Sequence, residues 1–165
     1  MTLVRAMTRN DLAAVSQLLG QSWRRTYAPI MGDEAVARLS DEKHAPDKLA
    51  AELDDENKMS FVAERADGSI AGYAMAAMDK KGDVLLDRLH IEPQAFGSGL
   101  AVDLLHAVLA AHAGIPSIAL EVIEGNDRAI AFYRKYGFEV VERRDAAHGV
   151  GGHASLIMRH MLPRA

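Results

Sequence analysis

Apolar residues recur with two different periods along this chain, and the change of period separates the expected helices from the expected strands. Residues 2–8 read TLVRAMT, an alternation of apolar and polar positions that predicts an edge strand. From 12 to 19, leucine and valine recur at helical spacing, and Asn10 or Asp11 can cap the helix that this spacing predicts. The chain is therefore expected to open with a strand followed by a helix.

A second helical region covers about 33–56 and is interrupted near Pro46, because proline removes a helical hydrogen bond. The pattern then changes to short apolar runs separated by turns that contain glycine, such as 66–69. Strands are predicted at 60–64, 70–78, 84–91, 118–123, 138–142 and 155–161, with helices from 99 to about 112 and from 126 or 127 to 137.

This order of elements predicts a mixed α/β fold. Consecutive strands in the first half favour antiparallel hairpins, whereas the strand–helix–strand unit over 84–123 needs a parallel crossover. We therefore expect a mostly antiparallel central sheet with one parallel β-α-β crossover and helices on both faces. No linker or internal repeat divides the chain, so residues 1–165 are expected to form a single domain.

Composition excludes several classes of function. The net charge of −4 argues against nucleic acid as a partner, and the nearest thing to a basic patch, Arg143-Arg144, is too short to change that. No apolar stretch is long enough to span a membrane, and the first ten residues lack an apolar signal-peptide core, so a cytoplasmic protein is expected. The absence of cysteine excludes disulfides, thiolate metal sites and an acyl-cysteine intermediate.

The segment LHIEPQAFGSGLAVDLL, residues 89–105, joins a predicted strand to a predicted helix. Pro93 ends the strand, and Gly97 and Gly99 lie in the loop before the helix. Backbone N–H groups at a helix start lack internal partners, and the helix dipole adds partial positive charge there. Glycines let a ligand approach this backbone closely. The segment is either a plain connection or an anion site suited to a pyrophosphate.

The segment LEVIEGNDRAIAFYRKYGFEVV, residues 120–141, places polar residues around another strand–helix junction. Taken singly, each has an ordinary structural explanation. Asn126 can be a helix N-cap, Tyr133 a packed aromatic, and Glu121 a solvent-facing strand residue. A functional interpretation becomes stronger than these structural explanations only when the two segments are considered together.

Together the two segments resemble the signature regions of the GNAT superfamily of N-acetyltransferases, and the order of elements agrees over nearly the whole chain. The family pattern for the first region is Arg or Gln, two residues, Gly, one residue, then Gly or Ala. Gln94 starts a literal match, but the frame that starts at Phe96 keeps the usual spacing after Pro93 and is preferred. Phe96 then stands where the family usually has Arg or Gln.

The resemblance implies acetyl-CoA as co-substrate and no metal. It assigns the cofactor-binding role to Leu89, His90 and Ile91 on the strand, to Gly97, Ser98, Gly99, Leu100, Ala101 and Val102 at the helix start, and to Asn126. Tyr133 would protonate the departing thiolate. Glu121 is the candidate base, because ribosomal-protein alanine acetyltransferases carry glutamate at the matching position; Asp87, Glu64 and water are rivals.

The acceptor is left open by the sequence. The C-terminal segment resembles polyamine and ribosomal-protein alanine acetyltransferases, which implies a primary amine such as a polyamine or a protein N-terminus. Trp23 and Tyr27, one helical turn apart, either form an aromatic wall for this substrate or pack in the core. The alternative function is a non-catalytic acetyl-CoA sensor, and a homodimer is compatible with either.

Overall fold

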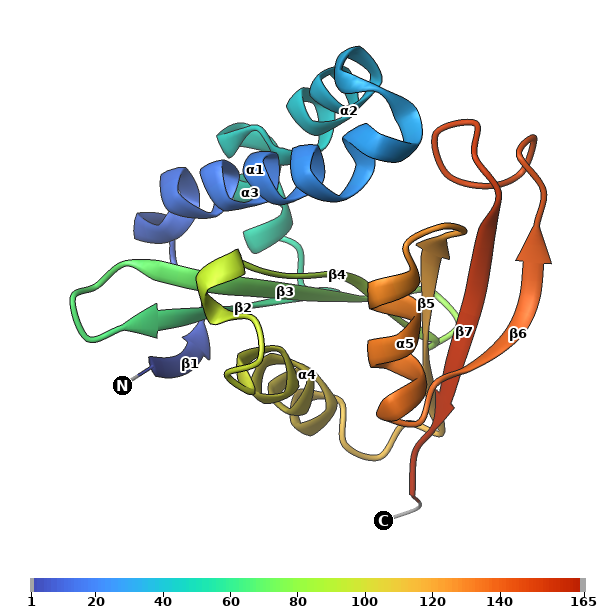
Figure 1. Ribbon diagram of the computed structural model, residues 1–165. Coiled ribbons are helices and arrows are strands. Elements are labelled where there is room, and N and C mark those ends of the chain that lie inside the picture. Colours follow the sequence, from blue (N-terminus) through green and yellow to red (C-terminus); the bar gives the residue numbers. More distant parts are fainter. Residues whose placement is uncertain (1, 164–165) are drawn as a thin grey trace.

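The computed structural model describes residues 2–163, which form one continuous sheet with helices on both faces (Figure 1). The strands are β1 (Thr2–Ala6), β2 (Lys58–Arg65), β3 (Ile70–Met78), β4 (Val84–Ile91), β5 (Ser117–Ile123), β6 (Glu139–Arg144) and β7 (Ser155–Met161). The helices are α1 (Leu12–Met31), α2 (Asp33–His44), α3 (Pro46–Leu53), α4 (Leu100–Ala111) and α5 (Asp127–Lys135), with short 3₁₀ turns η1 (Arg9–Asp11) and η2 (Pro93–Ala95).

The sheet order is β1-β2-β3-β4-β5-β7-β6, and every neighbouring pair is antiparallel except β4 and β5. The mixed sheet, the parallel crossover through α4 and the edge position of β1 confirm the predictions from the apolar pattern. The position of β7 between β5 and β6 was not predicted, because the choice of a pairing partner depends on contacts far apart in the chain.

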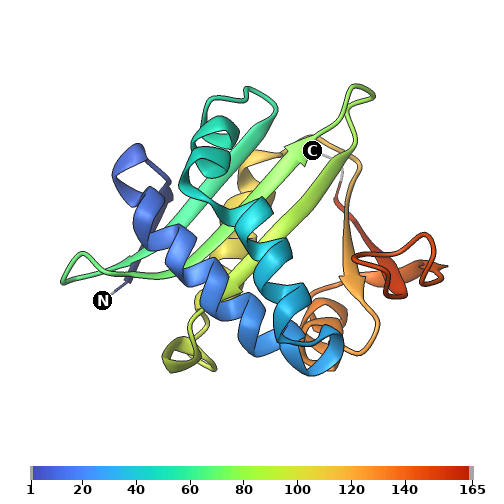
Figure 2. The same cartoon turned by 90° about the horizontal axis from the view of Figure 1, so that it is seen from above.

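Two apolar cores lie on opposite faces of the sheet (Figures 1 and 2). On one face, α1 and α3 pack against β2 and β3 through Leu19, Leu49 and Tyr73. On the other face, α4 and α5 pack through Leu104 and Tyr133 in the larger core. Burial of each amphipathic helix on its face of the sheet supplies most of the stabilisation.

Local sequence explains where the helices begin. A capping box formed by Thr8 and Asp11 starts the first helical turn, and the Thr8 N–H donates to Asp11 Oδ2 at 2.8 Å. Pro46 occupies the first turn of α3, where its missing N–H costs nothing. Gly32, with φ of 88°, separates α1 from α2. Among residues 2–163, no helix combines the length and the apolar character that a membrane span needs.

Candidate active site

A cleft opens where β4 and β5 separate. The two strands pair only at Val84 with Ile118 and at Leu85 with Ala119, so the facing edges beyond these pairs have no neighbouring strand. A cavity of about 430 Å³ lies there and is lined by α1, β4, β5, α5 and the segment that leads into α4. The separation of β4 from β5 leaves backbone groups of both strands free for a ligand.

A β-bulge at Asp87 sets which side chains of β4 face each side of the sheet. Met75 pairs with Arg88 and Ala76 pairs with Leu86, so Asp87 is the extra residue. Beyond the bulge, His90 pairs with Tyr73, whose side chain lies in the core beneath α1. Bulges re-aim side chains beside active sites. In the sequence, the feature that could have indicated this bulge is the charged pair Asp87-Arg88 inside an apolar strand.

The start of α4 presents free backbone donors to the cavity. Among residues 2–163, the N–H groups of Gly97, Gly99, Ala101 and Val102 have no hydrogen-bond acceptor, and all four residues line the cavity. Gly97 and Gly99 have φ of 79° and 86°, a left-handed conformation that favours glycine. Ser98 turns away: its hydroxyl donates to the Ala95 carbonyl oxygen. Free N–H groups at a helix N-terminus are suited to bind an anion.

Two tyrosines and an asparagine meet in the same cavity. Tyr133 is only 9% exposed, and burial raises its pKa well above the ordinary value, with Tyr27 adding to the effect. Burial also raises the pKa of Tyr27, while a side-chain hydrogen bond with Asn126 acts in the opposite direction. Asn126 Oδ1 accepts from the Ala129 N–H at 3.4 Å, so this residue is both the N-cap of α5 and part of the cavity wall.

The Glu121 carboxylate is held by two donors at the cavity wall. The Ser155 hydroxyl donates to Oε1 at 2.5 Å, and Arg144 Nη1 lies 3.4 Å from Oε2. Asp87 also lines the cavity, whereas Glu64 lies on β2 and is paired with Arg5 at 2.6 Å. The structure therefore brings Glu121 and one of its two carboxylate rivals to the cavity.

His90 contributes its side chain as well as its backbone. Ser22 Oγ on α1 lies 2.8 Å from His90 Nδ1, and both residues line the cavity. Burial, and secondarily the charge of Arg88, lower the pKa of His90 to about 4, so the ring is neutral at pH 7. Arg88 itself is paired with Glu52 at 2.7 Å beneath α1.

Comparison with known proteins decides the family. Residues 27–154 match the acetyltransferase (GNAT) domain family. This chain belongs to the GNAT acetyltransferases. An uncharacterised N-acetyltransferase of Mycobacterium tuberculosis is 34% identical over 133 residues, covering 79% of this chain and 83% of that protein. A spermidine N(1)-acetyltransferase of Thermoplasma acidophilum is 26% identical over 143 residues, covering 83% of this chain and 88% of that protein.

Solved structures share the GNAT fold over nearly the whole chain. The PaiA N-acetyltransferase of Thermoplasma acidophilum, in complex with coenzyme A, has a TM-score of 0.86 at 23% identity and covers 98% of this chain and 99% of its own. The ribosomal-protein-S18-alanine N-acetyltransferase of Escherichia coli has a TM-score of 0.74 at 20% identity and covers 100% of this chain and 96% of its own. Both agree with the arrangement of elements described above.

Most of the predicted GNAT site residues gather at one cavity. Those that line it are Leu89, His90, Ile91, Gly97, Gly99, Ala101, Val102, Glu121, Asn126, Tyr133 and Tyr27. Ser98 and Leu100 belong to the loop but do not line the cavity. Trp23 is 7% exposed and packs against Tyr27 and His44, with ring centroids 4.8 and 5.0 Å away, so it supports the cavity wall from behind.

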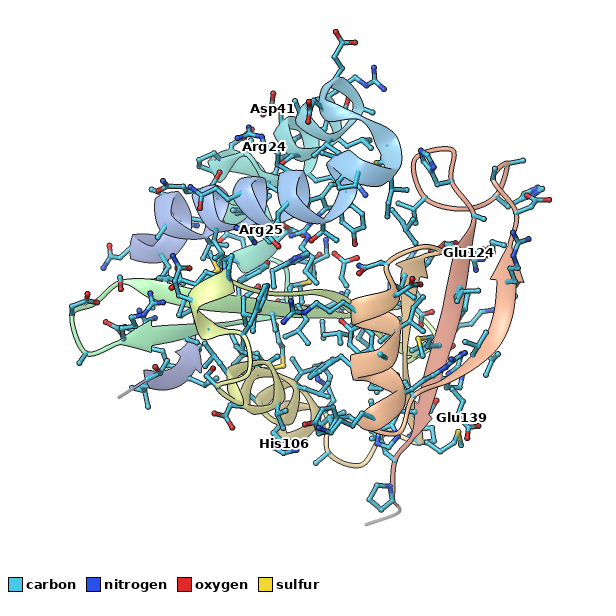
Figure 3. The ribbon with its side chains drawn as sticks, in the orientation of Figure 1. Arg24, Arg25, Asp41, His106, Glu124 and Glu139 are labelled. Atoms are coloured by element: carbon cyan, nitrogen blue, oxygen red, sulfur yellow. The ribbon has the colours of Figure 1, made fainter. Side chains whose placement is uncertain are left out.

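Sequence reasoning missed several residues that face this GNAT cavity. From α1 they are Ser22, Arg25 and Thr26, and from the other elements Arg88, Arg128, Phe132, Lys135 and Tyr136. The three α1 residues recur at helical spacing, which could have indicated one polar face. Figure 3 shows Arg25 on the side of α1 toward the sheet and Arg24 on the opposite side. Within residues 2–163, no group of three or more acidic or histidine side chains could hold a metal ion.

Proposed function

We propose that this protein transfers an acetyl group from acetyl-CoA directly to a primary amine. One observation carries the proposal: a single cavity is lined both by the four free N–H groups at the start of α4 and by Tyr133 and Glu121. The first set suits a pyrophosphate, and the second set supplies an acid and a base. A protein that only sensed acetyl-CoA would need the first set alone.

The residues present fit acetyl-CoA. The anion site at Gly97 and Gly99 accepts the pyrophosphate, and the open edges of β4 and β5 offer N–H and C=O groups to an extended amide chain such as pantetheine. Backbone N–H groups near Ile91 can polarise a carbonyl oxygen. When bound, acetyl-CoA supplies an activated thioester.

Glu121 receives a proton from the acceptor ammonium in this proposal, directly or through one water. An ammonium has no lone pair, so it must lose a proton before its nitrogen can form a bond to the acetyl carbon. The donors Ser155 and Arg144 fix the orientation of the carboxylate. Asp87 is the second carboxylate at the cavity and remains the rival base.

Tyr133 donates a proton to the thiolate that departs when the carbon–sulfur bond breaks. Its raised pKa keeps the phenol protonated throughout the neutral range, so a proton is available there. The ammonium nitrogen loses two protons on the way to the amide: the first goes to Glu121 before the bond to the acetyl carbon forms, and the second leaves as the carbon–sulfur bond breaks. The sulfur gains one proton from Tyr133, the second nitrogen proton restores the phenol, and the proton on Glu121 passes to solvent, so the reaction balances.

The acceptor that best fits is a cationic amine, either a polyamine or a protein N-terminus. Asp87 and Glu121 give the cavity two carboxylates, either of which can pair with an ammonium. The named relatives support both classes, since one is a spermidine acetyltransferase and a structural neighbour acetylates the alanine of ribosomal protein S18.

The test is a released-thiol assay on the purified protein with acetyl-CoA and a panel of polyamines, amino acids, aminoglycosides and N-terminal peptides. At least one amine is expected to release thiol above the hydrolysis background, and Tyr133→Phe should reduce that rate. If wild type binds acetyl-CoA and no amine releases thiol, the enzyme proposal is wrong and the sensor interpretation replaces it.

A further inference from the structure

A cation–π contact joins the two walls of the cleft. Arg128, in the first turn of α5, has its guanidinium carbon 3.5 Å from the ring centroid of Phe96, in the segment between η2 and α4. Both residues line the cavity. The separation is well inside the roughly 6 Å range in which a cation is attracted to an aromatic face. Phe96 therefore holds a positive charge next to Gly97, where the anion site begins.

The guanidinium is free to bind an anion. Among residues 2–163, no carboxylate lies within salt-bridge distance of Arg128. Stacking occupies the face of the guanidinium and leaves its N–H edges available, and these edges match the geometry of phosphate oxygens. Neutral backbone N–H groups alone would leave the charge of a pyrophosphate uncompensated.

The position of Arg128 is unfavourable for the helix that carries it. The N-terminus of a helix favours acidic residues, and a cation there opposes the helix dipole. Asp127, beside it, follows the rule, whereas Arg128 breaks it. A residue that breaks a local rule beside a cavity is expected to serve a ligand.

We propose that Arg128, carried on the Phe96 ring, binds the pyrophosphate of CoA and supplies the cationic side chain that position 96 does not. At the position where the family pattern has Arg or Gln, the Phe96 ring supports the guanidinium of Arg128. The positive charge therefore comes from α5 and not from the loop. Because stacking already orders the side chain, less conformational entropy is lost on binding. This inference rests on the proposed binding of acetyl-CoA.

Calorimetric titration of CoA and dephospho-CoA into Arg128→Gln tests the assignment. Affinity for CoA should fall about 10-fold or more, the size expected for a lost charge-assisted pair. Dephospho-CoA lacks the 3′-phosphate but keeps the pyrophosphate, so it should show the same loss. Affinity should also depend less on salt than in wild type, because one cation–phosphate contact is missing. Arg24→Gln removes an equal charge on the far side of α1 and should leave all three measurements unchanged.

The role of the ring is tested by Phe96→Leu, which keeps apolar bulk and removes the aromatic face. This variant should weaken CoA binding by a smaller factor, and the double variant should bind no more weakly than Arg128→Gln alone, because the two residues act as a unit. Both side chains are partly exposed, so thermal melting should confirm intact folding.

Three results would overturn the inference: wild-type CoA affinity in Arg128→Gln, a loss that disappears with dephospho-CoA, or additive losses in the double variant. Failure of wild type itself to bind CoA would instead refute the proposed function.

Discussion

At the scale of single residues, burial sets the pKa of Tyr133, the proposed proton donor. A buried phenol titrates at higher pH, because an apolar surrounding disfavours the phenolate. The same surrounding raises the proton affinity of a thiolate that forms beside it. The pKa of the phenol and the pKa of the thiol therefore shift in the same direction. Proton transfer between them remains feasible although the pKa of Tyr133 is well above its ordinary value.

Tyr133→Phe keeps the ring and removes the donor. If transfer limits turnover, kcat should fall by about 10²–10⁴, the usual contribution of general acid catalysis, while CoA affinity changes little. Tyr27→Phe is the matched control, because Tyr27 lies in the same cavity and its hydroxyl interacts with Asn126. That variant should change KM more than kcat. An unchanged kcat in Tyr133→Phe would remove the acid role from this residue.

Glu121→Gln tests the base. Acetyl-CoA binding should stay intact while transfer slows, and the loss should be greatest at low pH, where the acceptor is most fully an ammonium. At high pH free amine becomes available, so the variant should recover part of the rate. The measurement is a pH profile of kcat/KM for wild type, Glu121→Gln and Asp87→Asn. Activity that Glu121→Gln leaves untouched at every pH would transfer the role to Asp87 or water.

At the scale of elements, the site depends on where two regular structures end. The β4–β5 pairing ends after Leu85, and residues at the start of α4, which begins at Leu100, line the cavity beside these strands. Gly72 on β3 keeps these parts close together. A Cβ there would lie 2.9 Å from both Ile91 Cγ2 and Leu104 Cδ1. Close packing of β3, β4 and α4 thus fixes the anion site relative to the open strand edges.

Gly99→Asp tests the anion site with Gly99→Asn as its isosteric control. Both variants share the cost of the left-handed backbone, which Asn and Asp tolerate better than other side chains. Only Asp adds a negative charge beside the free N–H groups. Calorimetry should show CoA affinity at least about 10-fold weaker for Asp than for Asn, from like-charge repulsion at short range. Equal affinities in the two folded variants would remove this loop from the pyrophosphate site.

At the scale of the whole molecule, the apolar pattern was sufficient to predict the helices and strands. It was not sufficient to predict the order of the strands in the sheet or the irregularities in their pairing. Each predicted strand and helix is present, because periods of 2 and 3.6 are local properties of the chain. The insertion of β7 between β5 and β6 and the bulge at Asp87 depend on contacts between distant segments. No local pattern contains that information.

The same distinction applies to the site. Asn126 and Tyr133 were predicted from the resemblance of the two segments to the GNAT family, and both line the cavity. Ser22 and Arg25 were missed because their position at the cavity depends on how α1 packs against the rest of the fold. Arg128 was missed because its partner Phe96 lies 32 positions earlier in the chain, in the other signature segment.

Stability of the whole fold should depend on pH through two histidines, the buried His44 and the partly buried His90. Burial, followed by the charges of Arg88, His90 and Lys43, lowers the pKa of His44 to about 3, and burial with Arg88 lowers that of His90 to about 4. Both rings are neutral in the folded protein, whereas in the unfolded chain they take up protons below about pH 6.5. The unfolded state binds more protons in this window, so the free energy of unfolding falls as pH decreases from about 6.5 toward 4.

His44→Phe isolates one of these contributions. His44 is 2% exposed, its Nδ1 bonds Ser40 at 2.9 Å, and its Nε2 has no partner among residues 2–163, so an apolar ring loses one hydrogen bond. Urea unfolding at pH 7 and pH 4.5 should show wild type losing on the order of 2 kcal/mol more than the variant over this range. His106→Gln, on the exposed side of α4 (Figure 3), should keep the wild-type loss. Parallel pH profiles for His44→Phe and wild type would show that His44 takes up no extra proton on unfolding, because only a pKa difference between the two states makes stability depend on pH.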